Sequence, residues 1–369
     1  MRVLMVSKAC VVGPYQKKLE ELAALPGVEL TVVVPPFWRE AGRTILLERE
    51  HTLGYELVVE PMAFNGHFHL HFYPGLARQF RRVRPDVCHI DEEPYNLATY
   101  QALRLAEGVG AGTLFFTWQN LARRYPPPWS WIESYVLRRA GCAIAGNQEA
   151  VDVLRTKGYA GPTAVIPQFG VDPRIYRPFP EVRATASDGF TIGYAGRLVE
   201  QKGVHLLLEA VSRLDGDWHL RVLGTGPTCS ALLALSEELG ISKRVTFRAP
   251  ISASQMPRYL NDLDVLVLPS LARPNWKEQF GRVLVEAMAC EVLVIGAASG
   301  EIPNVIGDAG LVFPEGDVSA LTWELSRVQR DAHLRQELAM KGRQRVLENF
   351  TQARIAAETY RVYRDLLGN

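Results

Sequence analysis

Short apolar runs alternate with amphipathic segments along the first half of the chain. The runs predict buried strands at Val3–Val6, Leu30–Val34, Val87–Ile90, Leu114–Phe116 and Ala143–Ala145. Between the first two strands, the spacing of apolar residues predicts a helix over Gln16–Leu25. Nearly continuous apolar strands separated by helices are typical of a parallel sheet that is covered on both faces.

The same alternation begins again after Pro178-Phe-Pro180 and a polar stretch that ends at Gly189. It predicts strands at Phe190–Tyr194, His219–Leu223, Val245–Phe247, Val265–Leu268 and Leu293–Ile295, and a helix over residues 204–214. We therefore expect an α/β protein with two Rossmann-like, doubly wound domains that face each other across a cleft. Ligands of such sheets bind beyond the carboxyl ends of the strands, so the cleft is the expected active site.

The domain boundaries follow from this repetition. We expect an N-terminal domain over residues 1–175, a linker over 176–188 and a C-terminal domain over 189–350. Residues 351–369 form a separate terminal segment, in which the apolar positions of Gln352–Leu367 have the spacing of a helix.

Composition and charge narrow the class of protein. A chain of 369 residues with 47% hydrophobic content is long enough for two cores, and a formal charge of +1 gives no reason to expect nucleic-acid binding. The five cysteines are scattered without C-x-x-C spacing, which indicates reduced thiols. No apolar stretch reaches the length of a membrane span, and the run after Met1 is too short for a signal peptide. We expect a cytoplasmic protein, either free or peripheral on the inner face of the membrane.

The segment from Glu278 to Glu286 carries the most specific chemistry. On one continuous helix, eight steps of about 100° would leave the two carboxylates roughly 80° apart, so they would not share a face. If Glu278 instead lies in a loop and the helix begins near Gly281, both acids can meet one ligand at the helix start. Carboxylates beside free N–H donors suit a hydroxyl-rich, phosphorylated ligand. The alternative is an exposed pair of helix carboxylates without function.

The segment Gly193–Gly203 combines a strand end, a glycine turn and two cations. Arg197 offers a rigid fork of donors to phosphate oxygens, and Lys202 offers a compact charge. Gly196 and Gly203 let the backbone approach a ligand closely. The alternative is a solvated turn with two surface cations.

In this order, Gly196-Arg-x4-Lys-Gly, Glu278-Gln-Phe-Gly and Glu286-Ala-Met-Ala resemble the retaining glycosyltransferases of GT-B fold known as glycosyltransferase family 4. The resemblance is specific over residues 190–350 and looser over 1–175. It implies that the terminal helix crosses back to the first domain. It also implies front-face substitution, in which the leaving phosphate helps to deprotonate the acceptor.

The resemblance also implies roles for single residues. The catalytic residues would be Arg197 and Lys202, which hold the diphosphate, and Glu278, which holds hydroxyls of the transferred sugar. The remaining donor-binding residues would be Glu286, which accepts from the ribose hydroxyls, together with Gly196, Gly224, Phe280 and Gly281. No cofactor is implied, because the nucleotide diphosphate sugar is a co-substrate.

Two other motifs point to cofactors that we do not expect. Leu223-Gly224-Thr-Gly226 begins like a dinucleotide fingerprint, but Cys229 stands where the third glycine belongs, which argues against NAD. Asp215-Gly-Asp217 and Asp262-Leu-Asp264 fit the D-x-D pattern of metal-dependent transferases, yet both occupy ordinary places for aspartate. With Arg197 and Lys202 available to neutralise a diphosphate, we expect metal-independent transfer.

The first domain offers candidates for acceptor binding. Glu92 and Glu93 follow a predicted strand, and Asn120 follows the next one, where many relatives in the family carry a histidine that this chain lacks. Charge complementarity at a helix start is an equal explanation for the two acids. The triplet His67, His69 and His71 would share one face if extended, as a polar strand face or pocket lining rather than a metal site.

Basic and aromatic residues gather in Arg78–Arg84 and Arg123–Trp131, which fits contact with an anionic membrane as well as an ordinary surface. Together these observations predict a retaining glycosyltransferase that moves a hexose from a nucleotide diphosphate sugar to a glycan or lipid-linked acceptor. The alternatives are a sugar-nucleotide epimerase of the same fold and a non-catalytic nucleotide-sugar-binding protein.

Overall fold

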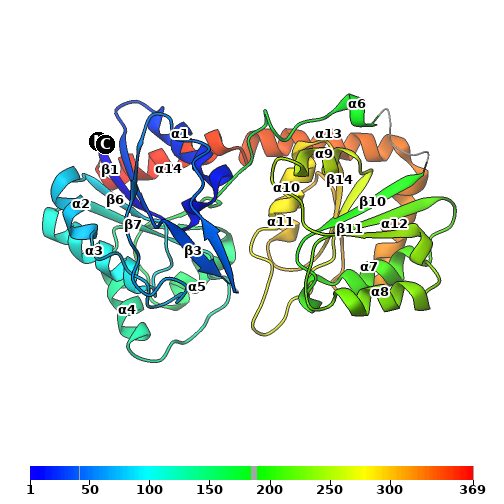
Figure 1. Cartoon of the computed structure of the whole chain (residues 1–369), viewed down its shortest axis with the longest axis horizontal. Helices are drawn as coiled ribbons and strands as arrows, with labels where there is room; N and C mark the ends of the chain where they lie inside the picture. Colours follow the sequence, from blue (N-terminus) through cyan, green and yellow to red (C-terminus); the bar gives the residue numbers. More distant parts are fainter. Residues whose placement is uncertain (41, 184–188, 369) are drawn as a thin grey trace. The chain divides into compact units, whose positions relative to one another are not determined.

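A computed structural model describes residues 1–40, 42–183 and 189–368 of the chain. Figure 1 labels many of its helices and strands, and the strands form two parallel sheets and one short antiparallel hairpin.

The first sheet has seven strands in the order β5-β2-β1-β6-β7-β8-β9, and every pairing in it is parallel. Its strands are β1 (Arg2–Val6), β2 (Glu29–Val34), β5 (Glu56–Val59), β6 (Val87–Ile90), β7 (Gly112–Thr117), β8 (Cys142–Ala145) and β9 (Thr163–Val165). The hairpin of β3 (Phe37–Glu40) and β4 (Arg43–Leu46) lies outside this sheet.

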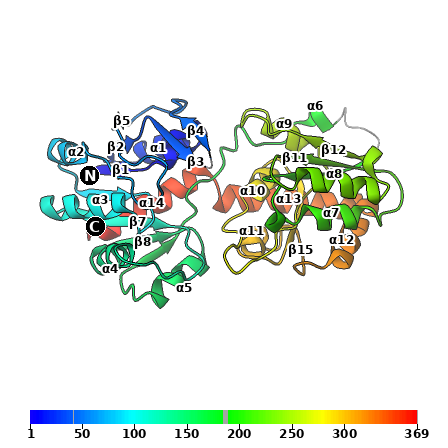
Figure 2. The ribbon, with the colours of Figure 1, turned by 60° about the horizontal axis from the view of Figure 1, so that its bottom comes forward.

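Helices cover both faces of the first sheet because its strands are apolar on both sides. Val3 and Met5 of β1 face a core shared with α1 (Lys17–Ala23) and α14 (Gln352–Leu366). Leu4 and Val6 face the opposite core, which the following helices complete: α2 (Leu76–Val83), α3 (Leu97–Val109), α4 (Trp129–Arg139) and α5 (Gln148–Thr156). Figure 2 shows these layers from a second side. This period of two along a fully buried strand is the pattern that predicts a parallel sheet.

The second sheet has six parallel strands in the order β12-β11-β10-β13-β14-β15. They are β10 (Phe190–Ala195), β11 (Trp218–Leu223), β12 (Val245–Arg248), β13 (Val265–Leu268), β14 (Leu293–Ala297) and β15 (Leu311–Phe313). The strand order reverses between β10 and β13, which marks the switch point where doubly wound sheets bind ligands.

The helices around the second sheet pack in pairs. Helix α7 (Val204–Val211) packs against α12 (Val318–Arg330), and α10 (Arg282–Ala289) packs against α13 (Ala332–Asn349). The other helices are α6 (Pro180–Arg183), α8 (Cys229–Glu238), α9 (Met256–Asn261) and α11 (Ile302–Ile306).

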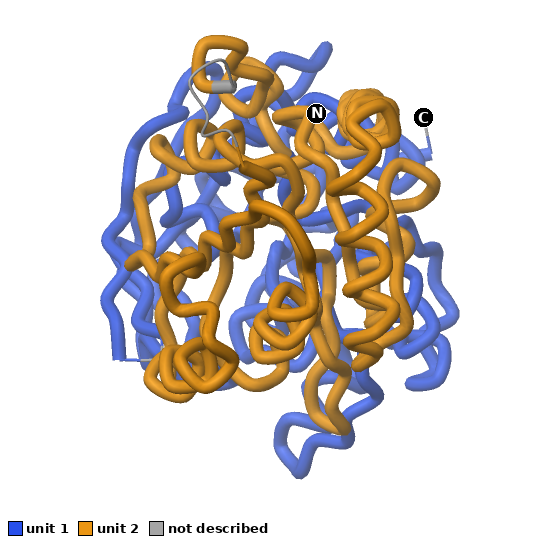
Figure 3. Tube along the Cα trace, turned by 90° about the vertical axis from the view of Figure 1, so that its right-hand side faces the viewer, with its two compact units in different colours: residues 1–170, 352–369 blue, residues 171–351 orange. Residues whose placement is uncertain are grey.

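The chain forms two compact units, which Figure 3 colours separately. Unit 1 comprises residues 1–170 and 352–369, and unit 2 comprises residues 171–351. Helix α14 belongs to unit 1, where it packs against α1 and its Tyr363 hydroxyl lies 2.7 Å from His89 Nδ1. Residues 184–188 of the expected linker lie outside the described residues, and residues 171–183 group with unit 2.

The predicted fold class of two parallel-sheet α/β domains is confirmed. One local expectation fails, because the histidine triplet is not extended. A turn places His71 N 3.1 Å from His67 O, with His71 buried and His67 exposed. The three imidazoles therefore do not share a strand face, and no group of three metal-binding side chains is found among the described residues.

Candidate active site

Four loops meet at the carboxyl edge of the second sheet, around its switch point. They follow β10, β11, β13 and β14, and they carry the expected donor-site residues Gly196, Arg197, Lys202, Gly224, Glu278, Phe280 and Gly281, while Glu286 lies in the helix that follows. Both D-x-D pairs lie elsewhere, because Asp217 precedes β11 and Asp264 precedes β13, at the amino edge of the sheet. Asp262 pairs with Arg221 there, and Asp264 accepts 2.8 Å from Thr191 N.

Glycines allow the loops to pack backbone against backbone. Gly203 has φ +65°, and a Cβ built on it would lie 2.0 Å from the carbonyl oxygen of Pro269. Gly224 has φ +153°, and its Cβ would lie 1.8 Å from the carbonyl oxygen of Gly196. A side chain at either position would force the loops apart, so the sequence needs glycine here.

Lys202 and Glu278 come together at this edge from two different loops. Lys202 Nζ lies 2.5 Å from Glu278 Oε2, and the Ser270 hydroxyl donates to the same oxygen at 3.0 Å. The Lys202 and Glu278 side chains are 18% and 11% exposed, so the pair is largely shielded but still open to solvent. A bound phosphate could replace Glu278 as the partner of Lys202, and a sugar hydroxyl could replace Lys202 as the partner of Glu278.

Arg197 stands apart from this pair. Its backbone is fixed by the Tyr194 hydroxyl, which donates to the Arg197 carbonyl at 2.8 Å. The Arg197 side chain is exposed, and within the described ranges it forms no ion pair. Its guanidinium is thus available to an incoming anion.

Helix α10 begins directly after the loop that carries Glu278. Gly281 is its N-cap, in the left-handed conformation with φ 73°, and no side chain caps the helix. Phe280 is buried, with its ring 5.7 Å from that of Phe350. Glu278 therefore lies in the loop just before α10. This is the arrangement in which both acids could meet one ligand at the helix start.

Glu286 lies inside α10, where it is 4% exposed. Its Oε1 atom lies 2.8 Å from Arg282 Nε, one turn earlier in the helix. Burial raises the pKa of Glu286, although the Arg282 guanidinium and a hydrogen bond from Tyr176 oppose the shift. Sequence reasoning missed both partners of Glu286, because neither stands in a recognisable motif.

The candidate acceptor residues lie in unit 1, at the carboxyl ends of β6 and β7. Glu92 is buried and forms ion pairs with Lys8 and with His71, whose Nε2 lies 3.4 Å away. Burial acts to raise the pKa of Glu92, but the charges of Lys8 and His71 outweigh it and hold the pKa at about 2. Glu92 is thus a buried anion with partners of its own.

Glu93 and Asn120 have different surroundings. Glu93 accepts from the Thr117 hydroxyl at 2.6 Å and from Trp118 N at 2.8 Å. Burial raises the pKa of Glu93 to about 7 in spite of these hydrogen bonds. Asn120 donates to Glu149 at 3.2 Å. Glu92 and Glu93 therefore both have partners within unit 1, and Asn120 is hydrogen-bonded to helix α5 of the same unit.

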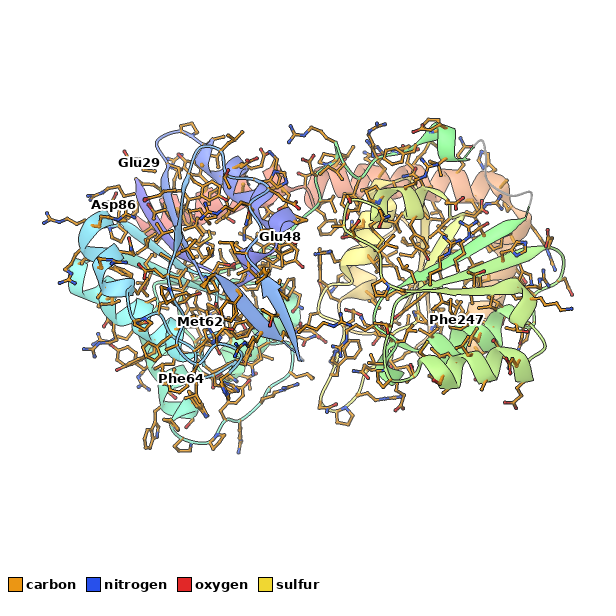
Figure 4. All side chains as sticks on the ribbon, viewed as in Figure 1. Glu29, Glu48, Met62, Phe64, Asp86 and Phe247 are labelled. Atoms are coloured by element: carbon orange, nitrogen blue, oxygen red, sulfur yellow. The ribbon has the colours of Figure 1, made fainter. Side chains whose placement is uncertain are left out.

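An aromatic cluster in unit 1 gathers around His69, whose ring lies 5.2 Å from Tyr95, 5.3 Å from Tyr125 and 5.3 Å from Trp129. Large apolar side chains are also exposed in unit 1. Phe64, labelled in Figure 4, is 56% exposed, and Trp131 is 69% exposed. Among the described helices, none is both long and apolar enough to cross a membrane.

Both halves of the chain match known protein families. Residues 19–174 match the family described as Glycosyltransferase Family 4, and residues 178–345 match the family described as glycosyl transferases group 1.

Two curated relatives come from mycobacteria. The chain is 29% identical over 205 residues to the GDP-mannose-dependent alpha-(1-6)-phosphatidylinositol monomannoside mannosyltransferase of Mycolicibacterium smegmatis, across 52% of this chain and 54% of that protein. It is 30% identical over 196 residues to the D-inositol 3-phosphate glycosyltransferase of Mycobacterium ulcerans, across 50% of this chain and 41% of that protein. The matched region thus spans about half the length of these relatives.

Two solved structures share the fold over nearly the whole chain. Sucrose-phosphate synthase from Thermosynechococcus elongatus matches with a TM-score of 0.75 at 20% identity, covering 100% of this chain and 99% of that one. HepE of Anabaena in complex with UDP matches with a TM-score of 0.77 at 17% identity, covering 99% of this chain and 100% of that one. Since each half of the chain matches a glycosyltransferase family and the fold is that of GT-B enzymes, the protein belongs to the glycosyltransferases of family 4 type.

Proposed function

We propose that this protein is a retaining, metal-independent glycosyltransferase that moves a hexose from a nucleotide diphosphate sugar to a glycan or lipid-linked acceptor. The observation that carries the proposal is the pairing of Lys202 with Glu278 at the carboxyl edge of the second sheet, where the loop after β10 also carries the exposed Arg197. A cation suited to a diphosphate and a carboxylate suited to sugar hydroxyls are thus in direct contact there.

Each residue then has a chemical task. Arg197 and Lys202 bind the diphosphate, on which negative charge builds as it leaves, so they stabilise the transition state more than the bound donor. Glu278 accepts from hydroxyls of the hexose, and Glu286 accepts from the ribose. Gly196, Gly224, Phe280 and Gly281 bring backbone close to the donor. The placement of both D-x-D pairs at the amino edge supports transfer without a metal.

The transfer breaks the bond between the anomeric carbon and the diphosphate oxygen and forms a bond to the acceptor oxygen. The acceptor proton passes to the leaving diphosphate, so no protein base is consumed. Retention of the anomeric configuration is part of the proposal. Its readout is the proton NMR coupling at the anomeric carbon of the product.

The first experiment measures nucleoside diphosphate release from a panel of nucleotide sugars, with EDTA present and with neutral and lipid-linked glycans as acceptors. We expect release from at least one donor that depends on an acceptor and tolerates EDTA. Saturable binding without release would favour a non-catalytic binding protein. Conversion of the sugar nucleotide to its epimer would favour an epimerase, and a requirement for a divalent metal would contradict the mechanism.

Donor binding should depend on pH through Glu286. Because the pKa of Glu286 is raised, lowering the pH protonates this carboxyl sooner than an ordinary glutamate and removes an acceptor for the ribose hydroxyls. We expect the donor Kd to rise as the pH falls and to rise less in Glu286→Gln. Calorimetric titrations at several pH values measure this, and an identical pH dependence in the variant would remove Glu286 from the ribose site.

We also propose that the protein works in the cytoplasm, with unit 1 contacting an anionic membrane. None of the five cysteines, all of which the structure describes, takes part in a disulfide, as expected of a reducing compartment. The exposed Trp131 follows the exposed Arg123 and Arg124 in the same segment of the chain, and surface segments that combine cations with an aromatic residue favour anionic lipid surfaces.

The membrane proposal predicts a difference between two tryptophans of nearly equal exposure. Trp131 is 69% exposed in unit 1, and Trp323 is 67% exposed on α12 of unit 2. We expect Trp131→Ser to weaken sedimentation with phosphatidylglycerol vesicles, while Trp323→Ser leaves it unchanged. Equal sedimentation of both variants and the wild type would show that this surface does not bind the membrane.

A further inference from the structure

The loop after β13 forms a clasp over the turn that carries Lys202. We define the clasp as residues 270–277. Its Leu271 N donates to the Gln201 carbonyl at 2.8 Å, and its Arg273 pairs with Glu200 at 2.8 Å. The clasp therefore contacts the two residues that precede Lys202, through one backbone hydrogen bond and one ion pair.

Trp276 is the part of the clasp that reaches Lys202. Arg273 and Trp276 pair through their backbones, with N···O distances of 2.7 Å and 3.1 Å, which closes the clasp into a tight turn. The turn places the Trp276 ring with its centre 5.0 Å from Lys202 Nζ. On another side, the same ammonium meets Glu278 at 2.5 Å.

The contact with Trp276 restricts the motion of a lysine side chain that would otherwise be flexible. Its four-carbon stem has several rotatable bonds, so an unsupported ammonium visits many positions. When sugar hydroxyls take over the Glu278 carboxylate, that carboxylate no longer fixes the ammonium. A tryptophan ring attracts a cation without carrying charge, so it can restrain Lys202 without competing for the phosphate.

We propose that Trp276 is a positioning residue that holds Lys202 in place for the leaving diphosphate during transfer. The inference rests on the proposed function, because it gives Trp276 a role only through Lys202. It also gives a role to a half-exposed tryptophan in a surface turn.

The test is a double-mutant cycle on the full chain, with steady-state kinetics for the donor found in the panel. Trp276→Leu keeps an apolar side chain but removes the ring face, and we expect kcat to fall by about 2- to 30-fold, with a smaller change in KM. Trp276→Phe keeps a ring and should lose less. In a Lys202→Ala background, Trp276→Leu should cause no further loss, since the ring then has no cation to hold.

The outcomes separate this inference from the proposed function. If Lys202→Ala has no effect on turnover, the proposed function fails. If Lys202→Ala lowers turnover and Trp276→Leu lowers it further by the same factor as in the wild type, Trp276 does not act through Lys202 and the inference is overturned. Unchanged kinetics of Trp276→Leu would overturn it as well. Should Trp276→Leu unfold, the cycle is run with Trp276→Phe, for which the same comparison decides.

Discussion

Replacing Glu278 by glutamine is expected to lower kcat/KM for the nucleotide sugar by about 10²- to 10³-fold, the range seen when one preorganised polar partner of a reacting group is removed. Glutamine has almost the same shape and can still accept from Ser270. It lacks the charge that holds Lys202 at 2.5 Å and that would bind the sugar hydroxyls. The loss should therefore appear in turnover while the unfolding temperature stays close to that of the wild type.

Glu237→Gln provides the matched control for this change. Glu237 is an exposed carboxylate on α8 of the same unit, away from the loops at the carboxyl edge. Its replacement removes the same charge and should leave kcat/KM unchanged. If Glu278→Gln turned over the donor as fast as Glu237→Gln, Glu278 would have no part in the reaction.

Replacing Gly203 by alanine is expected to destabilise unit 2 by at least about 3 kcal/mol, the range of severe single substitutions. The added Cβ would lie 2.0 Å from the Pro269 carbonyl oxygen, which is backbone and cannot rotate away. The turn that carries Lys202 would then have to move off the end of β13. We expect a lower urea midpoint and loss of donor binding in the same variant.

Gly240→Ala separates the effect of conformation from that of crowding. Gly240 has φ +69°, close to the +65° of Gly203, but its Cβ would meet nothing within 4 Å. Only the cost of a left-handed alanine remains, about 1 kcal/mol. A similar urea midpoint for the two variants would mean that the contact between the Lys202 turn and the β13 loop is not tight in solution.

The sequence predicts the central strands well because burial on both faces leaves uninterrupted apolar runs. Val87–Ile90 and Val265–Leu268 have the predicted bounds in the structure. The strands that the sequence did not predict in the two sheets, β5, β9 and β15, are three or four residues long and lie at sheet edges, and the hairpin strands β3 and β4 were missed as well. Local periodicity carries little information about such short edge strands.

The same difference between local patterns and long-range contacts applies to the candidate site. From the sequence, a helix start near Gly281 was the condition under which both acids meet one ligand, and in the structure Glu278 precedes α10 while Glu286 lies within it. The pairing of Lys202 with Glu278 joins positions 76 residues apart, and the approach of Tyr176 to Glu286 joins two segments without a shared motif. Such contacts depend on how the strands are ordered in the sheet, which no local pattern encodes.

The most direct test is a calorimetric titration of UDP and GDP into the wild type and into Glu278→Gln, with EDTA present. We predict that the wild type binds at least one of them without metal. The variant should bind the same nucleotide at least as tightly, because Lys202 no longer has the carboxylate as a competing partner. Failure of the wild type to bind either nucleotide, or weaker binding by the variant, would contradict the assignment of Lys202 to the diphosphate and Glu278 to the sugar.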